Sequence, residues 1–333
     1  MTGWRLASAV LALIFLGVIV PASVASAASS AISATPIIKY RSVDPGSQVD
    51  KVIWRGGLVL EGPEKFGGIS GITFIDQTRF IMVSDRGLFV SGSLSHSDDG
   101  RPKALENVKF TPVTNSKGAP LPKNYSRDSE AITSVYRNGQ PVAVRVGFEN
   151  LTRVADFALV NGRPAGAARE VVIPKWISAI RTNQSLESVC FASSASLIAG
   201  STLLLLEKYI VDGANSGWIL GNRDKGPVSL TLADGFKPTD CAFLPDGDLV
   251  VLERGIGFLS FTMQVRHIKA DQVKAGAVMA GEVILTGYGG DIDNMEGIGV
   301  RIAKDGSTRL VIVADNNFNS WERSLLLEFE LVE

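Results

Sequence analysis

The stretch DCAFLPDGDLVVLERG, residues 240–255, contains two short apolar runs on either side of a Pro-Asp-Gly-Asp turn. Apolar runs that flank an Asp-Gly turn predict a β-hairpin. The hairpin opens with one acidic residue, Asp240, and its second strand ends at another, Glu253. This combination of a hairpin with an acid at each end of the motif can be searched for along the rest of the chain.

Five such units occur in the sequence. Each opens with an acidic or hydroxyl residue followed by small and aliphatic residues, and successive openings lie 53 to 60 residues apart. A near-constant period predicts repeated structural units, and about 56 residues accommodates the four short strands of one propeller blade. The opening residues are Ser70, Glu130, Glu187, Asp240 and Glu296, and the closing acids are Asp85, Glu149, Glu207, Glu253 and Asp315.

The predicted fold is therefore an all-β propeller with five four-stranded blades. The last unit is incomplete, because only one further strand, residues 324–332, follows Asp315. An apolar strand at residues 52–60 precedes the first unit and is expected to complete the last blade, which would leave no open sheet edge. Six blades is the alternative if residues 32–66 contain additional strands.

The N-terminus has the pattern of an export signal, with Arg5, an apolar run and the small residues Ala25-Ser26-Ala27. We therefore expect a signal peptide at residues 1–27, a flexible lead-in at 28–50 and the propeller at 51–333. The expected location is periplasmic or secreted, with no stable membrane span after cleavage. The formal net charge of −1 excludes the basic surplus of nucleic-acid-binding proteins. We expect a monomer.

The chain has two cysteines, Cys190 and Cys241. An oxidising compartment would allow them to pair. They follow the opening acids Glu187 and Asp240 by three and one positions, so they have the same strand parity and their side chains should point in the same rotational sense. The parity favours two small buried thiols, and a disulfide is the alternative.

Acids at the openings of the units are expected to meet at one mouth of the central channel. Carboxylates crowded in this way repel one another unless a cation or protons offset the charge. Ca²⁺, which prefers oxygen ligands, is the expected cofactor. The alternative is structural, with each acid accepting hydrogen bonds from backbone amides of its own blade. The predicted metal ligands are Glu130, Glu187, Asp240 and Glu296, and the predicted catalytic acids are Asp85, Glu149, Glu207, Glu253 and Asp315.

Basic residues follow the closing acids closely in sequence. A guanidinium presents a planar fork that suits phosphate oxygens, so the mouth is predicted to take a small anionic substrate. Ion pairing between adjacent blades is the alternative role. No serine nucleophile elbow or phosphate-binding glycine loop occurs in the sequence. The predicted substrate-binding residues are Arg86, Arg153, Lys208 and Arg254.

Several of these segments resemble the exported bacterial phytase-like domain family, which is named for an esterase-like activity of phytase. The matching segments are Gly68–Gly71, Ser84–Gly87, Asp128–Ile132, Phe148–Asn150, Leu186–Ser188 and Asn294–Gly297. The resemblance extends from about Val52 to the C-terminus. It implies a β-propeller with recurrent acids and a proposed phosphoester-hydrolysing role. The positions that match the family pattern are Asp85, Glu130, Glu149, Glu187, Glu296 and Asp315, whereas Ser70 and Asp240 depart from a uniform acid ring.

The leading hypothesis is a metal-dependent phosphoester hydrolase in which a metal-bound water attacks the substrate. Two alternatives remain at this point. One is a propeller that binds a ligand or partner without turning it over, and the other is a lactonase or esterase that holds a cation but needs no phosphate grip.

Overall fold

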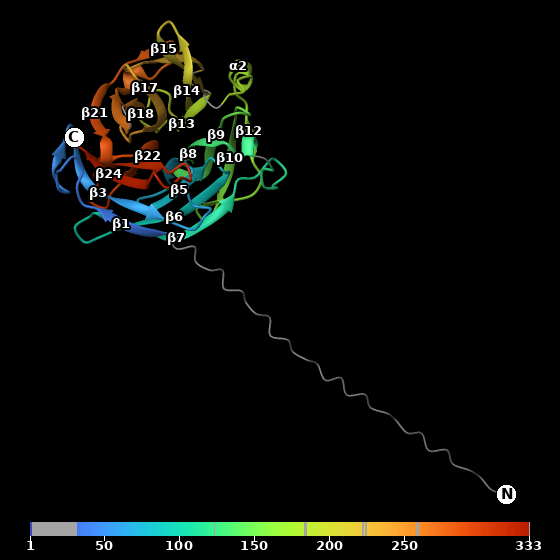
Figure 1. Cartoon of the computed structure of the whole chain (residues 1–333). Coiled ribbons are helices and arrows are strands. Elements are labelled where there is room, and N and C mark those ends of the chain that lie inside the picture. The colour runs from blue at the N-terminus through green and yellow to red at the C-terminus, as the bar shows by residue number, and fades with distance from the viewer. Residues whose placement is uncertain are drawn as a thin grey trace.

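A computed structural model describes residues 1, 32–122, 124–182, 185–221, 223, 225–257 and 260–332. Apart from Met1, the expected signal peptide lies outside these described residues. Figure 1 shows sheets arranged around a common centre, with the chain passing through them in sequence order. The five sheets confirm the five-bladed propeller and exclude the six-bladed alternative.

Blades one to three begin one after another along the chain, each with its innermost strand, and only β20 of blade three comes later, after β19 of blade four. Blade one contains β4 (Ile69–Phe74), β5 (Arg79–Ser84), β6 (Leu88–His96) and β7 (Pro102–Pro112). Blade two contains β8 (Ser129–Arg137), β9 (Gln140–Phe148), β10 (Arg153–Val160), β11 (Arg163–Pro164) and β12 (Arg169–Val171). Blade three contains β13 (Leu186–Phe191), β14 (Thr202–Val211), β15 (Ala214–Leu220), β16 (Gly226–Thr231) and β20 (Val278–Met279).

Blades four and five complete the ring. Blade four contains β17 (Phe236–Phe243), β18 (Leu249–Gly257), β19 (Ser260–Ile268) and β21 (Glu282–Tyr288). Blade five contains β22 (Asn294–Ile302), β23 (Thr308–Asp315), β24 (Ser324–Leu331), β3 (Val52–Glu61), β1 (Ser33–Ile37) and β2 (Gln48–Val49). The short helical segments are α1 (Asn124–Arg127), α2 (Lys175–Ser178), η1 (Ala270–Gln272) and η2 (Gly289–Asp291).

The two ends of the folded chain meet in blade five, as the sequence predicts. Strand β3 pairs antiparallel with β24 from Ser324 opposite Leu60 to Leu331 opposite Val52. In Figure 1 the blue β3 lies beside the red β24. Closure of this kind removes the open sheet edges that would otherwise pair with another chain.

The expected flexible lead-in at residues 28–50 is wrong for residues 33–50, which are part of the fold. Strand β1 pairs with β3, with Ser33 opposite Glu61 and Ile37 opposite Gly57. Tyr40 is 1% exposed, and its hydroxyl donates a 2.7 Å hydrogen bond to the carbonyl of Thr286 in blade four. Its ring centroid lies 5.3 Å from that of Trp54. The segment after Ile32 therefore extends the outer edge of blade five and bridges it to blade four.

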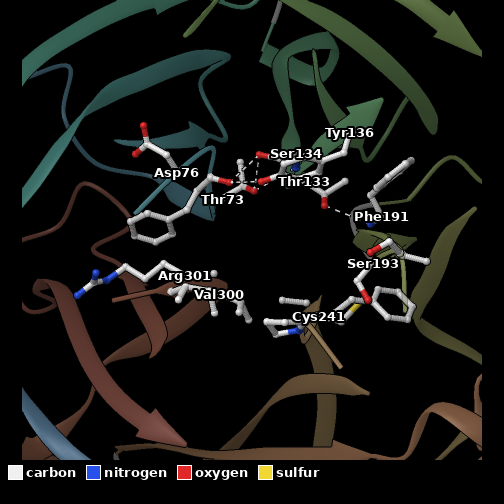
Figure 2. Close-up of a pocket in the computed structure, with 18 of the residues that line it drawn as sticks. Thr73, Asp76, Thr133, Ser134, Tyr136, Phe191, Ser193, Cys241, Val300 and Arg301 are labelled. Carbon is white, nitrogen blue, oxygen red and sulfur yellow. Dashed lines mark hydrogen bonds between the residues drawn. The ribbon is translucent and has the colours of Figure 1, made fainter. Parts of the chain in front are cut away.

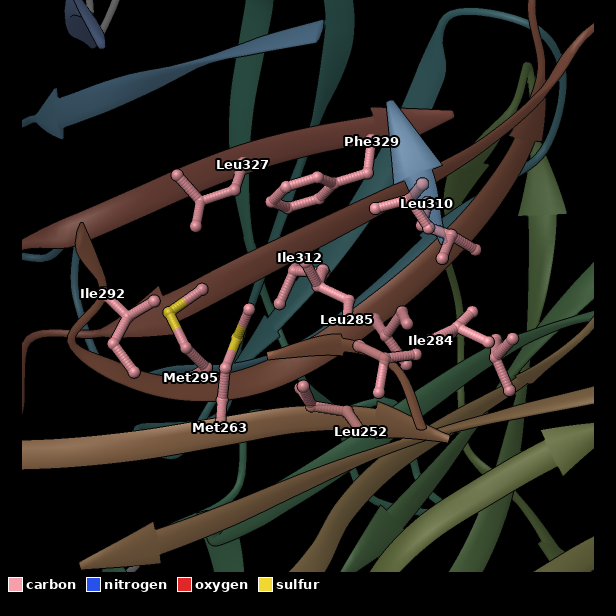
Figure 3. Close-up of a cluster of buried hydrophobic side chains, with 14 of the residues drawn as sticks. Leu252, Met263, Ile284, Leu285, Ile292, Met295, Leu310, Ile312, Leu327 and Phe329 are labelled. Atoms are coloured by element: carbon pink, nitrogen blue, oxygen red, sulfur yellow. The ribbon is translucent and has the colours of Figure 1, made fainter. Parts of the chain in front are cut away.

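Apolar side chains fill the spaces between adjacent blades. Figure 3 shows the cluster between blades four and five, where Leu252 and Met263 of blade four face Ile312, Leu327 and Phe329 of blade five. These side chains come from strands that alternate inward and outward positions. Burial of these side chains holds neighbouring blades together and so fixes the positions of their innermost strands around the channel.

Within the described residues, none of the helices has the length and hydropathy needed to cross a membrane.

Candidate functional site: an acidic channel mouth

A β-bulge near the start of each innermost strand sets which side chain turns into the channel. In every blade the ladder between the first two strands skips one residue of the innermost strand near its start. A bulge leaves the extra residue unpaired and redirects its side chain. The skipped residues are Ser70, Glu130, Glu187, Thr239 and Glu296.

The second strand of each blade supplies another equivalent position at the same mouth. This position directly follows the residue that pairs with the one immediately before the bulge. The residues found there are Asp85, Glu149, Glu207, Arg254 and Asp315. We call this end of the channel, formed by the two sets of equivalent positions, the acidic mouth.

Blade four departs from the sequence-based register by one residue. Thr239 occupies the bulge and Arg254 occupies the second-strand position, so the predictions for Asp240 and Glu253 are corrected. Both side chains are buried outside the ring of mouth positions. Asp240 and Glu253 are predicted at the mouth because they are the acids of blade four that best match the acids of the other units. The pairing of the two strands, and not the residue type, decides which side chain enters the channel.

Asp240 instead ties two innermost strands together. Its carboxylate accepts hydrogen bonds from the backbone N–H of Cys241, at 2.8 Å, and from that of Ile298 in blade five, at 2.9 Å. Asp240 therefore has the structural role that is the alternative to metal binding, in which an acid accepts hydrogen bonds from backbone amides. One of its two amides, however, belongs to the next blade rather than to its own. Equivalent hydroxyl contacts link other blades, since Thr73 accepts from the Ser134 N–H and Thr133 from the Phe191 N–H.

Glu253 pairs within its own blade. Its two carboxylate oxygens accept from Arg266 at 2.7 and 2.9 Å, and one also accepts from the Gln264 amide at 2.5 Å. The side chain is 1% exposed. This buried and fully paired carboxylate is a structural element of blade four and lies apart from the mouth.

The register of blade four also explains why the two cysteine side chains face each other. Cys190 pairs opposite Leu203 and Cys241 opposite Val251, which places Cys241 one position earlier in its strand than Cys190 relative to the bulge. Their parities therefore differ, and the side chains face each other between blades three and four. They form a disulfide with a Cα–Cα distance of 5.8 Å. The expectation of two unpaired thiols is wrong.

Three carboxylates of blade two form the tightest cluster at the mouth. Asp128, Glu130 and Glu149 each offer an oxygen, and these oxygens lie within 4.8 Å of one another. The Asn150 amide donates to Asp128, and the Ser185 N–H donates a 2.5 Å hydrogen bond to Glu149. None of the ion pairs found among the described residues involves this cluster. Asp128 is not among the metal ligands predicted from the sequence, although it stands two residues before Glu130.

Burial and mutual repulsion raise the pKa values of the mouth acids. Desolvation raises the pKa of Glu149 to about 8, and nearby Asp128 adds to the effect. Desolvation likewise raises the pKa of Glu130 well above its ordinary value, with repulsion from Glu187 as the next contribution. The pKa of Glu187 is raised for the same reasons, first by burial and then by Glu149. These groups can all ionise near neutral pH only if a cation compensates their charge.

The raised pKa values continue around the ring beyond blade two. Burial, followed by repulsion from Asp315, raises the pKa of Asp85 to about 7. Burial raises the pKa of Asp315 to about 6, partly opposed by a hydrogen bond from the Asn317 N–H. The pKa of Glu296 is raised to about 7 by burial, although Arg254 acts in the opposite direction. Raised pKa values are thus found for mouth acids of blades one, two, three and five.

The predicted basic residues have different surroundings. Arg254 donates hydrogen bonds to Glu296 and to the Asn294 side chain. Arg86 stacks on Phe318, with the guanidinium carbon 3.1 Å from the ring centroid. The side chain of Lys208 lies outside the described part of the structure.

Arg153 is held away from the carboxylate cluster. It donates hydrogen bonds to the carbonyls of Ser126 at 2.7 Å and Leu151 at 3.1 Å, and its carboxylate contact is Glu170 at 3.9 Å. A basic residue that the sequence analysis did not select, Lys237, donates a 3.2 Å hydrogen bond to Glu207. Among the described residues, Lys237 and Arg254 pair directly with mouth acids, and the charge of Arg86 acts on Asp85.

The region that contains the acidic mouth matches a known protein family. A model of the Phytase-like family, described as "Esterase-like activity of phytase", matches residues 64–318. The chain belongs to the Phytase-like family. The matched region contains every mouth residue named above and omits β3, the strand that closes the propeller. Comparison with curated proteins gave no match.

Solved structures resemble this phytase-like chain only distantly. A PQQ-bound aldose sugar dehydrogenase from Streptomyces coelicolor shares 11% identity, with 80% of this chain and 94% of that one covered at a TM-score of 0.43. An α-L-arabinofuranosidase from Podospora anserina shares 14% identity, with 81% and 94% covered at a TM-score of 0.48. A putative 6-phosphogluconolactonase from Bacteroides uniformis shares 11% identity, with 84% and 78% covered at a TM-score of 0.36. Likenesses this distant carry no information about activity.

Proposed function

We propose that the protein is a Ca²⁺-dependent hydrolase that cleaves a phosphoester at the acidic mouth. The observation that supports this most directly is the cluster of Asp128, Glu130 and Glu149, whose oxygens approach within 4.8 Å of one another. Hard cations with oxygen ligands suit such a cluster. The family description, which refers to phytase, suggests the phosphoester.

The residues present fit a cation in chemistry and in charge. Three carboxylates with raised pKa values, or crowded beside such groups, would become ionised ligands once a divalent ion offset their repulsion. Asn150, through its hydrogen bond to Asp128, would hold one ligand in orientation. Glu187 stands next to the cluster and would complete the acidic wall. Calcium bound there would polarise a phosphoryl oxygen and lower the pKa of a coordinated water.

The remaining mouth residues would have three roles under this proposal. Arg254, which already neutralises Glu296, would contact the substrate anion, and Arg86 would do so from the neighbouring rim. Asp85 and Asp315, whose pKa values are raised to about 7 and about 6, could exchange protons near neutral pH. Glu207 would keep Lys237 close to the ring.

Cleavage of a carboxylic ester or lactone is a second candidate, supported by a specific contact. Arg254 is already bound to Glu296 and Asn294, so a substrate phosphate would have to compete with those partners. A neutral ester would need only the cation and an ionised carboxylate.

The test uses the purified mature protein, stripped of metal with a chelator and then titrated with CaCl₂. We would measure turnover of p-nitrophenyl phosphate, bis-p-nitrophenyl phosphate and phytate, with p-nitrophenyl acetate and a γ-lactone as ester substrates. Ca²⁺-dependent phosphate release that is lost in Glu130→Gln supports the proposal. Turnover of the esters alone supports the second candidate. Binding of Ca²⁺ without turnover of any substrate would leave a non-catalytic binding propeller and overturn both hydrolase assignments.

A further inference from the structure

A second candidate site lies at the opposite end of the channel. The far halves of the innermost strands surround a cavity of about 1000 Å³. Figure 2 shows Thr73, Ser134, Phe191, Cys241 and Val300 arranged around this open space. Among the described lining residues, none is a carboxylate of the acidic mouth.

The innermost strands of neighbouring blades pack closely near the acidic mouth. A Cβ atom added to Gly297 of β22 would lie 2.7 Å from the Cα atom of Gly71 in β4, so the two strands are in close contact just inside the acidic mouth. Beyond these glycines, Ile72, Ile132 and Ile298 line the inner part of the cavity. A ligand in the cavity would therefore meet apolar side chains where the cavity comes nearest to the acidic mouth.

The cavity wall combines aromatic surfaces with hydroxyl groups. Four aromatic side chains line it, namely Phe74, Tyr136, Phe191 and Phe243. The hydroxyl oxygen of Ser193 is buried and has no hydrogen-bond partner among the described residues. A buried hydroxyl without a partner is costly, so rotation of the Ser193 side chain toward the cavity would be favoured by a hydrogen bond to a polar ligand.

The charged residues of the lining are already neutralised or exposed. Asp76 accepts a 2.5 Å hydrogen bond from Arg79. Arg301 donates a 2.8 Å hydrogen bond to Glu328, which is buried. Arg223 is exposed, so solvent screens its charge. The cavity therefore offers no unpaired buried charge to a ligand.

We propose that this cavity binds a small neutral ligand that presents both an apolar ring face and hydroxyl groups, the chemistry of a mono- or disaccharide. Aromatic side chains would pack against the ring face, while Ser193 and other polar groups of the rim would bond the hydroxyls. The volume is at the upper end of the range for small-molecule sites, about 300–1000 Å³. This site is independent of the hydrolytic activity proposed for the acidic mouth.

Cellobiose and maltose are suitable probes, and glucose 6-phosphate is the charged counterpart. Binding to the mature protein in the presence of CaCl₂ would be measured by saturation-transfer NMR and by calorimetry. At least one neutral disaccharide should bind, and glucose 6-phosphate should bind more weakly. Ser193→Ala should weaken the binding by about 2- to 10-fold through loss of one hydrogen bond. Ser193→Phe, which fills the cavity, should weaken it further.

Two variants serve as controls. Leu197→Phe places the same aromatic in the same loop at a residue that is 57% exposed and outside the described lining, so binding should not change. Glu130→Gln alters the acidic mouth and should also leave disaccharide binding unchanged. Absence of binding by both disaccharides would overturn the proposal, as would equal binding by folded Ser193→Phe and the parent protein. Loss of hydrolysis in Glu130→Gln with retained disaccharide binding would separate the two sites.

Discussion

Arg254 and Glu296 come from neighbouring blades and form a hydrogen-bonded ion pair within the ring of mouth carboxylates. Arg254 stands where the other blades have Asp85, Glu149, Glu207 and Asp315. The Asn294 amide donates a 2.8 Å hydrogen bond to the same Glu296 carboxylate. Blades four and five thus form a partly neutralised side of the mouth, whereas the blade-two carboxylates Asp128, Glu130 and Glu149 form no ion pair with any residue that the structure describes.

Replacement of Arg254 should weaken both stability and phosphate binding. Arg254→Gln leaves Glu296 without its cationic partner, and we expect a loss of about 1–3 kcal/mol in the free energy of unfolding. Phosphoester turnover should fall at least about tenfold if the guanidinium binds the transition state. Urea unfolding and steady-state kinetics at saturating CaCl₂ would measure the two effects.

A double variant provides the control for this ion pair. Arg254→Gln combined with Glu296→Gln removes both charges, so part of the lost stability should return. Unchanged stability in the single variant would show that the pair contributes nothing measurable. Unchanged turnover would remove Arg254 from substrate binding.

Substitutions of Asp240 and Glu130 should separate structural from metal-binding acids. Asp240→Ala leaves the N–H groups of Cys241 and Ile298 without their acceptor, and we expect a loss of about 1–3 kcal/mol in the free energy of unfolding. Its calcium affinity should stay close to that of the parent. Glu130→Gln should remove the calcium-dependent rise in melting temperature while the metal-free protein remains at least as stable. Calcium titrations followed by calorimetry distinguish the two, and a reversed result would return Asp240 to the metal site.

The metal-free protein should lose stability as the pH rises through neutrality. The folded-state pKa values of Glu149, Asp85 and Asp315, about 8, about 7 and about 6, lie above those of unfolded chains, about 4. The folded state therefore binds more protons, so these groups favour folding below about pH 4 and lose that contribution between about pH 4 and 8. Melting temperatures recorded with chelator should fall over this interval.

Calcium should cancel that fall. If the proposed calcium site exists, the ionised cluster would bind the cation at pH 8, so added CaCl₂ should raise the melting temperature, and the effect should fade near pH 5 as protons compete. Glu130→Gln with Glu149→Gln should flatten the pH dependence of the metal-free protein. A melting temperature that rises from pH 5 to pH 8 in chelator would contradict the assignment of raised pKa values.

The disulfide between Cys190 and Cys241 should contribute measurably to folding. It joins blades three and four across 51 positions of sequence, and links of this kind typically stabilise by about 2–4 kcal/mol. The double variant Cys190→Ala with Cys241→Ala should unfold at a correspondingly lower urea concentration. Mass spectrometry after alkylation of the denatured protein should find no free thiol in the parent. Two alkylated cysteines before reduction would contradict the pairing.

Periodic features of the sequence predicted most of the fold. The spacing of the hairpins indicated five blades, and the apolar strand at residues 52–60 indicated closure with residues 324–332, both of which the sheet pairing confirms. Tyr40 could not be anticipated in the same way. Its segment lacks strand alternation, and its burial depends on Trp54 and Phe329, which come together only in the folded protein.

The sequence by itself determined the repeat, the propeller class and the acids Glu130, Glu149, Glu187 and Glu296, because period and residue type are local properties of the chain. Only the tertiary structure decided the register of blade four, where a bulge at Thr239 turns Asp240 and Glu253 away and brings Arg254 into the ring. The same one-residue difference brings Cys190 and Cys241 face to face. A one-residue offset reverses the facing of every later side chain in a strand, and it depends on backbone pairing with a partner strand rather than on residue type.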